Sequence, residues 1–442
     1  MSNSNTTTKT KLTVGFLVLA ALAGVAVAAP ADDFAAGRQL KRDLNLDKIP
    51  VINNPNHVPN FRAAVRQVEL KYNVTVGSPA PRVPGESPAN GGYLPLDPDS
   101  TWDIAYLAQV EIGTPPQTLT LNLDTGSSDL WVFSSDLSAA DQANHDVFDY
   151  HKSTTWKPIS GATFSVGYGD GSAASGGVGR DVVKLGGLTI PNQAVEIAQT
   201  QYKFAKGNND GLVGLGYYTG RHGNKVSTGP EKTPVDNLIA QGTLPPGSQL
   251  FTSAFYSTRN PEKSFYTFGY IDEDLVAQSG QSLKWAPIDG SQGYWQFPST
   301  TARVGGKAVT GIPSNQVAIA DTGTSLALVH PAVAKALYAQ IPDVVTDRDG
   351  FYHFPNSSIS KLPKFEVAVG PNLWTIQPED LAYLWDDADQ LWVGGVQALN
   401  DGLSIFGDSF LKSVYAVWDR GNNRLGLVSK IQKTQNFDRN DQ

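Results

Sequence analysis

Apolar and polar residues alternate over short stretches of this chain, and glycine or proline separates one stretch from the next, a pattern typical of β-strands. The alternation is clearest at 119–123, where leucine occupies every second position, and at 317–319. Two short segments have the features of helices instead, because both 234–240 and 331–341 begin with proline, which favours the first turn of a helix. The pattern predicts an all-β protein with a few short helices.

The only long apolar run lies near the start of the chain. It covers residues 12–28, follows Lys9 and Lys11, and ends in small residues, so we interpret residues 1–28 as a cleaved signal peptide. An uncleaved anchor is the alternative, because the run is only just long enough to span a bilayer. The C-terminal residues are polar and show no lipid-anchor signal. We therefore expect a secreted protein without a stable membrane anchor, with vacuolar delivery as the alternative destination.

Charge is unevenly distributed between the start of the chain and the rest. Residues 29–90 contain eight basic and six acidic residues, whereas the chain beyond them contains 24 basic and 36 acidic residues. A mildly basic segment before a strongly acidic body indicates a leader segment (residues 29–90) that docks electrostatically, with a flexible N-terminal arm as the alternative. Apolar residues at helical spacing over 61–68 predict a helix capped by Asn60. Six prolines within 79–98 mark a stretch that is open to cleavage.

The residue types present limit the chemistry that the protein can perform. The chain has no cysteine, which excludes disulfides, thiol nucleophiles and cysteine-ligated metal sites. Its six histidines include no H-E-x-x-H spacing, and no G-x-S-x-G motif occurs. A hydrolase of this composition must therefore use carboxylates, hydroxyls or amides, and we expect neither a metal nor a cofactor.

One short motif occurs twice and carries the strongest functional signal. The sequence LDTGSS at 123–128 recurs as ADTGTS at 320–325, each time after a predicted strand. Each copy is followed later by two apolar residues and a glycine, at 212–214 and at 405–407. A single Asp-x-Gly is most often an ordinary turn. The duplicated context instead predicts two related halves whose pseudo-twofold axis brings two aspartates together.

The paired aspartates, Asp124 and Asp321, suit hydrolysis by an activated water molecule at acid pH. Two carboxylates about 3 Å apart do not both ionise, so they share one proton and titrate as a unit. One carboxylate acts as a base towards a water molecule between them, while the protonated one donates to the oxygen of the substrate carbonyl. The glycines that follow, Gly126 and Gly323, let the backbone approach the carboxylates closely.

These motifs resemble those of the pepsin-like aspartic endopeptidases, in particular the secreted fungal enzymes. The resemblance extends over residues 104–428 and includes further motifs in the family order, at 127–132, 168–172, 210–215, 294–297 and 406–408. It implies an all-β, bilobal pepsin-like aspartic protease fold with pseudo-twofold related lobes. The N-terminal lobe would span 91–280 and the C-terminal lobe 281–436, followed by a polar tail at 437–442.

The resemblance also assigns supporting roles around the two aspartates. The hydroxyls of Thr125 and Thr322 are expected to form hydrogen bonds across the two turns. Those of Ser127 and Thr324 are expected to hydrogen-bond the outer carboxylate oxygens and keep them oriented. The family usually retains a disulfide in its second half, which this chain lacks.

A predicted hairpin at 164–172 corresponds to the flap that covers the substrate in this family, with an ordinary surface hairpin as the alternative. The resemblance implies that Tyr168 lines the pocket before the scissile bond and hydrogen-bonds Trp131. The other substrate-binding residues that it implies are Gly169, Asp170, Ser172 and Leu212. Because the Asp170 carboxylate can pair with an ammonium group, we expect cleavage after Lys as well as beside bulky apolar residues. The glycines do not form a phosphate loop, because no Lys-Ser/Thr follows them.

The leader segment contains Lys71-Tyr72, a pair that plugs the cleft in this family by placing an ammonium between the two carboxylates. The alternative is a surface lysine after a helix. We expect the leader to inhibit its own enzyme and to be released by self-cleavage at acid pH, which describes a zymogen. Asn73 and Asn356 each begin a glycosylation sequon. The polar segment 217–232 is predicted to be a loop, without an assigned role.

Two other classes of function remain open on the sequence. One is a non-catalytic relative that acts as a binding protein or inhibitor, although such a protein typically loses a catalytic aspartate or the flap tyrosine. The other is a carbohydrate-active β protein with paired carboxylates, which the nine tryptophans favour but the duplicated motif does not. We expect protein and peptide substrates, inhibition by pepstatin-type compounds, a monomer and no nucleic-acid partner.

Overall fold

The computed structural model covers the 442-residue chain and describes residues 31–53, 61–77, 106–167, 173–202, 209–220, 225–257, 259, 261–400 and 402–437. The predicted signal peptide, the Asn60 cap, the proline-rich stretch and the tip of the predicted flap lie outside these ranges. Within the described ranges, no helix is long and apolar enough to cross a membrane.

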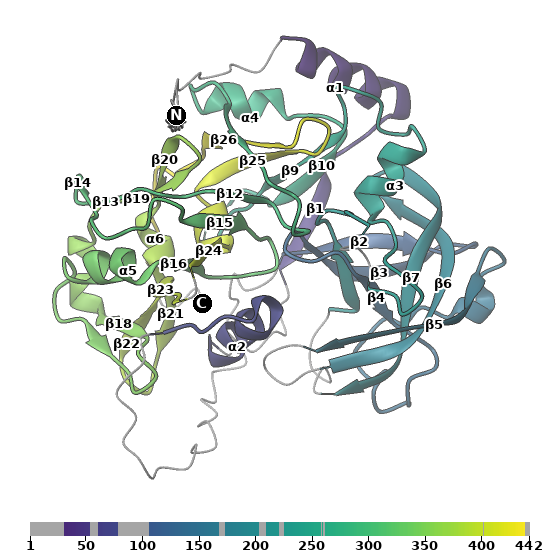
Figure 1. Ribbon diagram of the computed structural model, residues 1–442, viewed down its shortest axis with the longest axis horizontal. Coiled ribbons are helices and arrows are strands. Elements are labelled where there is room, and N and C mark those ends of the chain that lie inside the picture. Colours follow the sequence, from purple (N-terminus) through teal and green to yellow (C-terminus); the bar gives the residue numbers. More distant parts are fainter. Residues whose placement is uncertain are drawn as a thin grey trace, which may run out of the picture.

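Strands dominate the fold, as the alternation of apolar residues predicts (Figure 1). The largest sheet contains, in spatial order, β11 (Lys284–Pro287), β26 (Arg424–Ser429), β25 (Val414–Asp419), β9 (Leu250–Ala254), β10 (Phe265–Phe268), β1 (Ile49–Asn53), β2 (Tyr106–Ile112), β3 (Gln117–Asp124), β8 (Gly211–Gly214), β4 (Leu130–Phe133), β7 (Leu188–Tyr202), β6 (Ala173–Leu185) and β5 (Lys157–Gly167).

Three smaller sheets belong to the second half of the chain. The first contains β12 (Gln296–Pro298), β15 (Val317–Ala320), β24 (Leu403–Phe406), β16 (Ala327–Val329) and β23 (Val396–Ala398). The second contains β14 (Lys307–Ala308), β13 (Ala302–Val304), β19 (Phe365–Val369) and β20 (Asn372–Ile376). The third contains β17 (Val345–Thr346), β18 (Tyr352–Pro355), β22 (Leu391–Gly394) and β21 (Ala382–Asp386).

The helices of the described chain are short, apart from two in the leader segment. They are α1 (Ala31–Leu44), α2 (Phe61–Tyr72), α3 (Pro234–Ala240), α4 (Glu273–Gln278), α5 (Pro331–Tyr338), α6 (Pro378–Leu381) and α7 (Asp408–Leu411), with 3-10 turns η1 (Tyr150–Lys152) and η2 (Asn356–Lys361). The helix predicted at 234–240 has the predicted bounds, with the Thr233 side chain as its cap. The helix predicted at 331–341 ends earlier, at Tyr338.

The two halves of the chain share one sheet. Strands β9 and β10 come from the first half and β25 and β26 from the second, and β25 pairs antiparallel with β9. Aromatic side chains pack against each other where β9 and β25 pair. Phe251 and Trp418 stack with ring centres 5.6 Å apart, and Trp295 meets Trp418 edge-on at 5.3 Å. The shared sheet therefore fixes the position of one half relative to the other.

The two halves repeat one local arrangement around the Asp-Thr-Gly turns. In the first half, β8 lies between β3 and β4, parallel to β3 and antiparallel to β4. In the second half, β24 lies between β15 and β16 in the same way. The leucines of β3 are almost completely buried, as their alternation predicts. The predicted pseudo-twofold relation is thus visible in the strand pairing.

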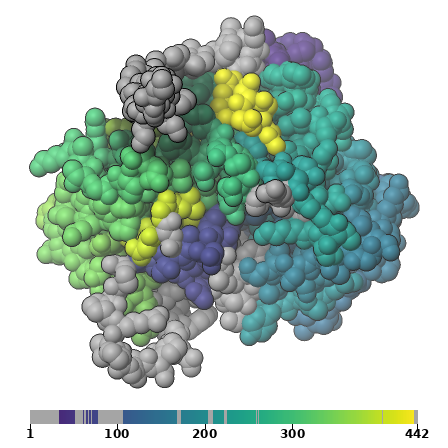
Figure 2. All heavy atoms as spheres, in the orientation of Figure 1, coloured from purple at the N-terminus to yellow at the C-terminus, as the bar shows by residue number. Residues whose placement is uncertain are grey.

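The leader segment contains more structure than its sequence indicates. Helix α2 confirms the helix predicted from residue 61, and it lies between the two halves of the molecule (Figures 1 and 2). Helix α1 and strand β1 were not predicted. The Arg38 guanidinium of α1 donates to both carboxylate oxygens of Glu273, at 2.6 and 2.7 Å. Strand β1 pairs with β10 on one side and β2 on the other, so it is an integral part of the large sheet.

Candidate active site

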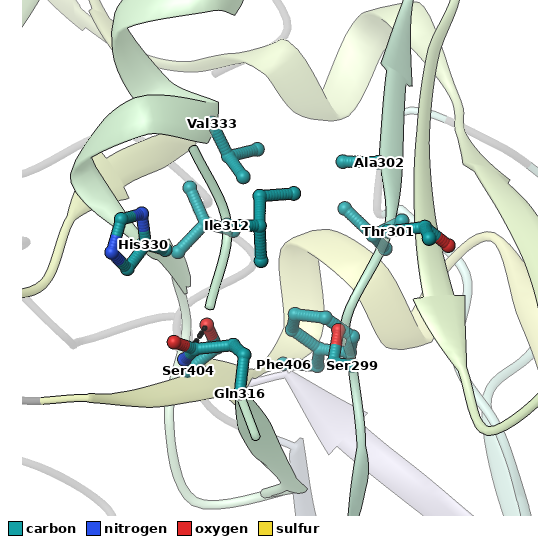
Figure 3. A pocket seen from close by; sticks show the side chains of 11 residues that line it. Ser299, Thr301, Ala302, Ile312, Gln316, His330, Val333, Ser404 and Phe406 are labelled. Carbon is teal, nitrogen blue, oxygen red and sulfur yellow. Dashed lines mark hydrogen bonds between the residues drawn. The ribbon is translucent and has the colours of Figure 1, made fainter. Parts of the chain in front are cut away.

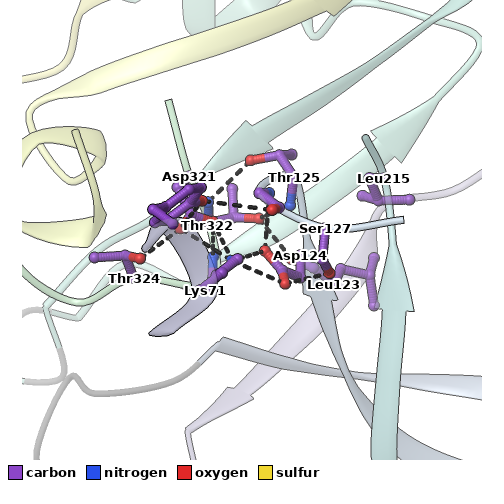
Figure 4. A network of polar contacts seen from close by, with 12 residues as sticks. Lys71, Leu123, Asp124, Thr125, Ser127, Leu215, Asp321, Thr322 and Thr324 are labelled. Atoms are coloured by element: carbon purple, nitrogen blue, oxygen red, sulfur yellow. Dashed lines mark hydrogen bonds and ion pairs between the residues drawn. The ribbon is translucent and has the colours of Figure 1, made fainter. Parts of the chain in front are cut away.

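The two Asp-Thr-Gly turns meet and are joined by reciprocal hydrogen bonds (Figure 4). The backbone N–H of Thr125 donates to Thr322 Oγ1 at 3.0 Å, and the N–H of Thr322 donates to Thr125 Oγ1 at 3.0 Å. The two hydroxyls then donate onward to carbonyls of the opposite strand, Thr125 to Ala320 at 3.1 Å and Thr322 to Leu123 at 2.6 Å. Each turn is therefore fixed by the other rather than by its own lobe alone.

Each aspartate carboxylate is held by two donors from its own turn. For Asp124 these are the Gly126 N–H at 2.8 Å and the Ser127 hydroxyl at 2.5 Å. For Asp321 they are the Gly323 N–H at 2.9 Å and the hydroxyl of Thr324. Both aspartates are at most 2% exposed, so these hydrogen bonds replace water and orient the carboxylates towards each other.

The glycines of both turns are required by the closeness of the two carboxylates. A Cβ atom at Gly126 would collide with the Asp321 carboxylate, and one at Gly323 would collide with that of Asp124. Neither glycine has a positive φ, so the requirement is steric and not conformational. Any larger residue at either position would push the two aspartates apart.

Lys71 of the leader segment occupies the point on which both carboxylates converge (Figure 4). Its Nζ atom lies 2.8 and 3.0 Å from the two oxygens of Asp124, and 3.2 and 3.1 Å from those of Asp321. The next residue, Tyr72, donates its hydroxyl to Asp321 at 2.8 Å and meets the ring of Tyr294 edge-on at 5.3 Å. The last turn of α2 therefore covers the aspartate pair completely.

The electrostatics of the pair are asymmetric. Burial raises the pKa of Asp124 to about 6, although the ammonium of Lys71 acts in the opposite direction. Burial would also raise the pKa of Asp321, but Lys71 and the hydrogen bonds from Thr324 and Gly323 lower it to about 2. Burial lowers the pKa of Lys71, but the two carboxylates outweigh this effect and raise it. The ammonium of Lys71 thus opposes protonation of both carboxylates while the leader segment is bound.

The rest of α2 and the residues after it rest on an apolar surface of the second half. Phe61 packs edge-on against Phe351, with ring centres 4.8 Å apart, and Val65 and Val68 are buried in the same cluster. The chain then runs beside residues 398–400. Gly77 donates its N–H to the Ala398 carbonyl at 2.8 Å, and Asn400 donates its N–H to the Thr75 carbonyl at 3.1 Å. The leader segment is thus bound in part as an added strand.

The predicted flap is a hairpin in its described part. Strands β5 and β6 pair antiparallel up to Gly167 and Ala173. The residues predicted to bind substrate at its tip, Tyr168, Gly169, Asp170 and Ser172, lie outside the described residues. Trp131 and Leu212 are 2% and 6% exposed and belong to the apolar cluster that includes Phe164 of the hairpin. In the leader-bound structure these two side chains support the base of the hairpin.

The remaining sequence predictions concern the surface and the ends of the chain. Asn73 is exposed just after α2, and Asn356 is exposed at the start of η2, where its Oδ1 accepts from the Trp392 indole at 3.0 Å. The predicted loop at 217–232 contains no regular element in its described part, although its Tyr217 is buried. Phe437, the first residue of the predicted tail, packs against the core.

A separate small cavity lies in the second half beside α5 (Figure 3). Its volume of about 10 Å³ leaves room for no more than about one water molecule. Its lining includes Gln316, His330 and Ser404, but neither aspartate. Among the described residues, no group of three or more His, Asp or Glu side chains is placed to hold a metal ion. The aspartate pair is therefore the site that combines converging reactive groups with a means of covering them.

The chain matches the family model of the eukaryotic aspartyl proteases over residues 105–430. It is 35% identical over 390 residues to endothiapepsin of Cryphonectria parasitica, covering 86% of this chain and 89% of that protein. It is also 35% identical over 364 residues to aspergillopepsin-1 of Aspergillus pseudoglaucus, covering 81% and 86%. The crystal structure of the aspartic proteinase from Irpex lacteus superposes with a TM-score of 0.61 at 27% identity, covering 75% of this chain and 97% of that one.

The fold, the paired turns and these similarities define the class of protein. The chain belongs to the eukaryotic aspartyl protease family. Within that family it is a pepsin-like aspartic endopeptidase of the fungal type, as its similarity to endothiapepsin and aspergillopepsin-1 shows.

Some contacts of the site were not predicted from the sequence. The Tyr266 hydroxyl donates to the carbonyl of Leu123, next to Asp124, at 3.1 Å. Tyr294 packs against Tyr72. The family motif at 294–297 was recognised in the sequence, but no contact was assigned to Tyr294. Neither tyrosine carries a local signal that its side chain reaches a distant residue, so neither contact could have been found without the fold.

Proposed function

We propose that the protein is a secreted zymogen whose mature form hydrolyses peptide bonds at acid pH, with Asp124 and Asp321 as the catalytic residues. The observation that carries this proposal is the convergence of all four carboxylate oxygens on Lys71 Nζ, at 2.8 to 3.2 Å. A point that lies within hydrogen-bond distance of both carboxylates accommodates a water molecule once the ammonium has left.

The chemistry follows from one proton shared by two carboxylates. The ionised carboxylate accepts a proton from the water molecule. The water oxygen attacks the carbonyl carbon of the substrate at the same time. The protonated carboxyl gives its proton to the carbonyl oxygen, which forms a neutral diol. The diol collapses as the C–N bond breaks: the carboxyl that took up the water proton gives a proton to the nitrogen, and one diol hydroxyl returns a proton to the other carboxylate, which restores the shared proton. Before the reaction the proton belongs to the pair as a whole, because coupled carboxylates titrate together. The donors from Ser127 and Thr324 hold both carboxylates in place throughout.

The zymogen form is supported by how the leader segment is held. Lys71 and Tyr72 cover the aspartates. The leader also makes contacts far from the site, including the ion pair of Lys48, just before β1, with Asp272. We propose that residues 1–28 are removed as a signal peptide and residues 29–90 as the leader. The mature enzyme then comprises an N-terminal lobe at 91–280 and a C-terminal lobe at 281–436.

The preference for bulky apolar residues around the scissile bond is supported by the surface that the leader covers. Phe351, Tyr383 and Leu399 form part of an apolar cluster beside α2 and residues 74–77. An extended peptide that replaces the leader would meet the same surface. Acceptance of Lys through Asp170 rests on the sequence resemblance alone. Secretion, glycosylation at Asn73 and Asn356, a monomeric state and sensitivity to pepstatin complete the proposal, with the vacuole as the alternative destination.

The test compares the full chain with Asp124→Asn and Asp321→Asn after incubation at acid pH. Each variant should lose activity on an acid-denatured protein by about a thousandfold or more, because the two aspartates act as one unit. Pepstatin should inhibit the unaltered protein. The matched control is Asp389→Asn, at an exposed aspartate in the turn between β21 and β22, which should keep full activity. Turnover by either active-site variant close to that of the unaltered protein would refute the proposal.

A further inference from the structure

A buried tyrosine of the shared sheet reaches the turn that carries Asp124. Tyr266 lies on β10 and is completely buried. Its hydroxyl donates to the carbonyl of Leu123, the residue before Asp124, at 3.1 Å. The same carbonyl accepts the hydroxyl of Thr322 at 2.6 Å. This carbonyl is therefore where the shared sheet and both catalytic turns are connected.

The contact breaks the pseudo-twofold symmetry of the site. The counterpart of Leu123 in the other half is Ala320, whose carbonyl accepts the Thr125 hydroxyl at 3.1 Å. In the described structure, the Leu123 carbonyl receives two side-chain hydroxyls and the Ala320 carbonyl receives one. Burial raises the pKa of Tyr266 well above its usual value, and the nearby aspartates raise it further. The phenol thus remains a hydrogen-bond donor at every pH at which the enzyme works.

We propose that Tyr266 is a positioning residue for Asp124, acting through the Leu123 carbonyl. This inference rests on the proposed function, because it concerns the same aspartate pair. The Leu123 carbonyl and the Asp124 N–H belong to one peptide plane, so fixing the carbonyl fixes the start of the Asp124 side chain. Without the phenol, the Leu123 carbonyl keeps one side-chain donor, the Thr322 hydroxyl, beside the pairing of β3 with β8. A catalytic group must be held to within about 0.5 Å, so a small rotation of the plane is enough to slow the reaction.

The effect is expected on the chemical step and not on substrate binding. Tyr266 is completely buried in the shared sheet, where it pairs with Ser253 of β9, a strand that the mature enzyme keeps. Substrate meets the aspartates from the side that Lys71 covers in this structure. A change at Tyr266 therefore alters kcat through Asp124 and leaves the surface that binds the peptide intact.

The experiment compares the acid-activated enzyme with its Tyr266→Phe variant on one peptide substrate over a range of pH. We expect kcat to fall by about fivefold, the rate equivalent of one ordinary hydrogen bond, with KM within about twofold. The pH dependence of kcat should also shift, because the relative position of the two carboxylates sets how they share the proton. The matched control is Tyr415→Phe, a second completely buried tyrosine of the shared sheet, whose hydroxyl accepts from the Asp272 N–H at 2.8 Å.

Tyr415→Phe should lower the thermal stability about as much as Tyr266→Phe while leaving kcat and its pH dependence unchanged. An unchanged kcat and pH profile in Tyr266→Phe, or the same kcat loss in Tyr415→Phe, would overturn the inference. If Tyr266→Phe does not fold, Tyr266→4-aminophenylalanine keeps a donor at the ring para position and should keep kcat within about threefold. A folded 4-aminophenylalanine variant with lower kcat overturns the inference. Inactivity of the unaltered enzyme would instead refute the proposed function.

Discussion

Replacing Lys71 by methionine tests the plug at the aspartate pair, because it removes the charge and keeps most of the volume. In the structure the Lys71 side chain is 11% exposed, and its ammonium lies within 3.2 Å of all four carboxylate oxygens. We expect the Lys71→Met precursor to lose its leader segment faster than the unaltered precursor at a fixed acid pH.

The magnitude follows from the burial of the pair. Removing one partner of a buried ion pair costs about 3 to 5 kcal/mol. The ammonium lowers the pKa of both aspartates, so its loss lets the pair take up a proton. Protonation leaves less uncompensated charge in the buried site, and the lower end of the range therefore applies. If the leader segment docks more weakly by about 3 kcal/mol, the fraction of precursor molecules whose aspartate pair is uncovered rises by about a hundredfold. The rate of self-processing should rise by the same factor.

The assay follows the loss of the leader by mass spectrometry after a jump to acid pH, at several precursor concentrations. Lys41→Met is the matched control, since Lys41 is also a leader lysine but lies over the Tyr270 ring at 4.5 Å, away from the aspartates. It should change the rate by less than about fivefold. The double variant Lys71→Met with Asp124→Asn should not process itself. Equal rates for Lys71→Met and the unaltered precursor would refute the reasoning.

Two further predictions concern the N-terminal half. Glu196 is completely buried beside Asp129, and neither of its carboxylate oxygens has a hydrogen-bond partner in the described structure. Burial raises the pKa of Glu196 well above its value of 4.5, so its contribution to stability is present in acid and is lost as the pH rises through the folded-state pKa. The Tm of Glu196→Gln should therefore fall less between pH 4 and about pH 7 than the Tm of the unaltered protein. An equal fall in the two proteins would contradict this. Asp170→Thr should lower cleavage after Lys but not after Phe, measured on paired peptides; equal losses on both would rule out the ion pair.

Repetition in the sequence was enough to predict that the two Asp-Thr-Gly turns meet. The duplicated Asp-Thr-Gly motif predicts two turns that meet, and the strands around Asp124 and Asp321 pair in the same way in both halves. Lys71-Tyr72 could be placed because the pair matches a family motif. These features depend on short local patterns, which can be recognised without knowledge of the rest of the fold.

The contacts that depend on distant segments could not be predicted. Strand β1 includes Pro50, which locally argues against a strand, and its pairing partners β10 and β2 are distant in the sequence. Helix α1 contacts residues such as Glu273, which lies more than two hundred positions away in the chain, so its local sequence does not indicate where it docks. Tyr266 is one of 16 tyrosines, and nothing in its local sequence distinguishes its hydroxyl from the others.

The position of β1 has a consequence for the enzyme after maturation. Ile49 pairs with β10 of the shared sheet, and Val51 pairs with β2 of the first half, so this one strand makes the sheet continuous. Its departure would expose two unpaired strand edges in the middle of the molecule, and open edges invite pairing with any extended peptide. If the leader segment is released as proposed, another extended segment is needed to pair with β10 and β2, because an enzyme with both strand edges open would tend to aggregate.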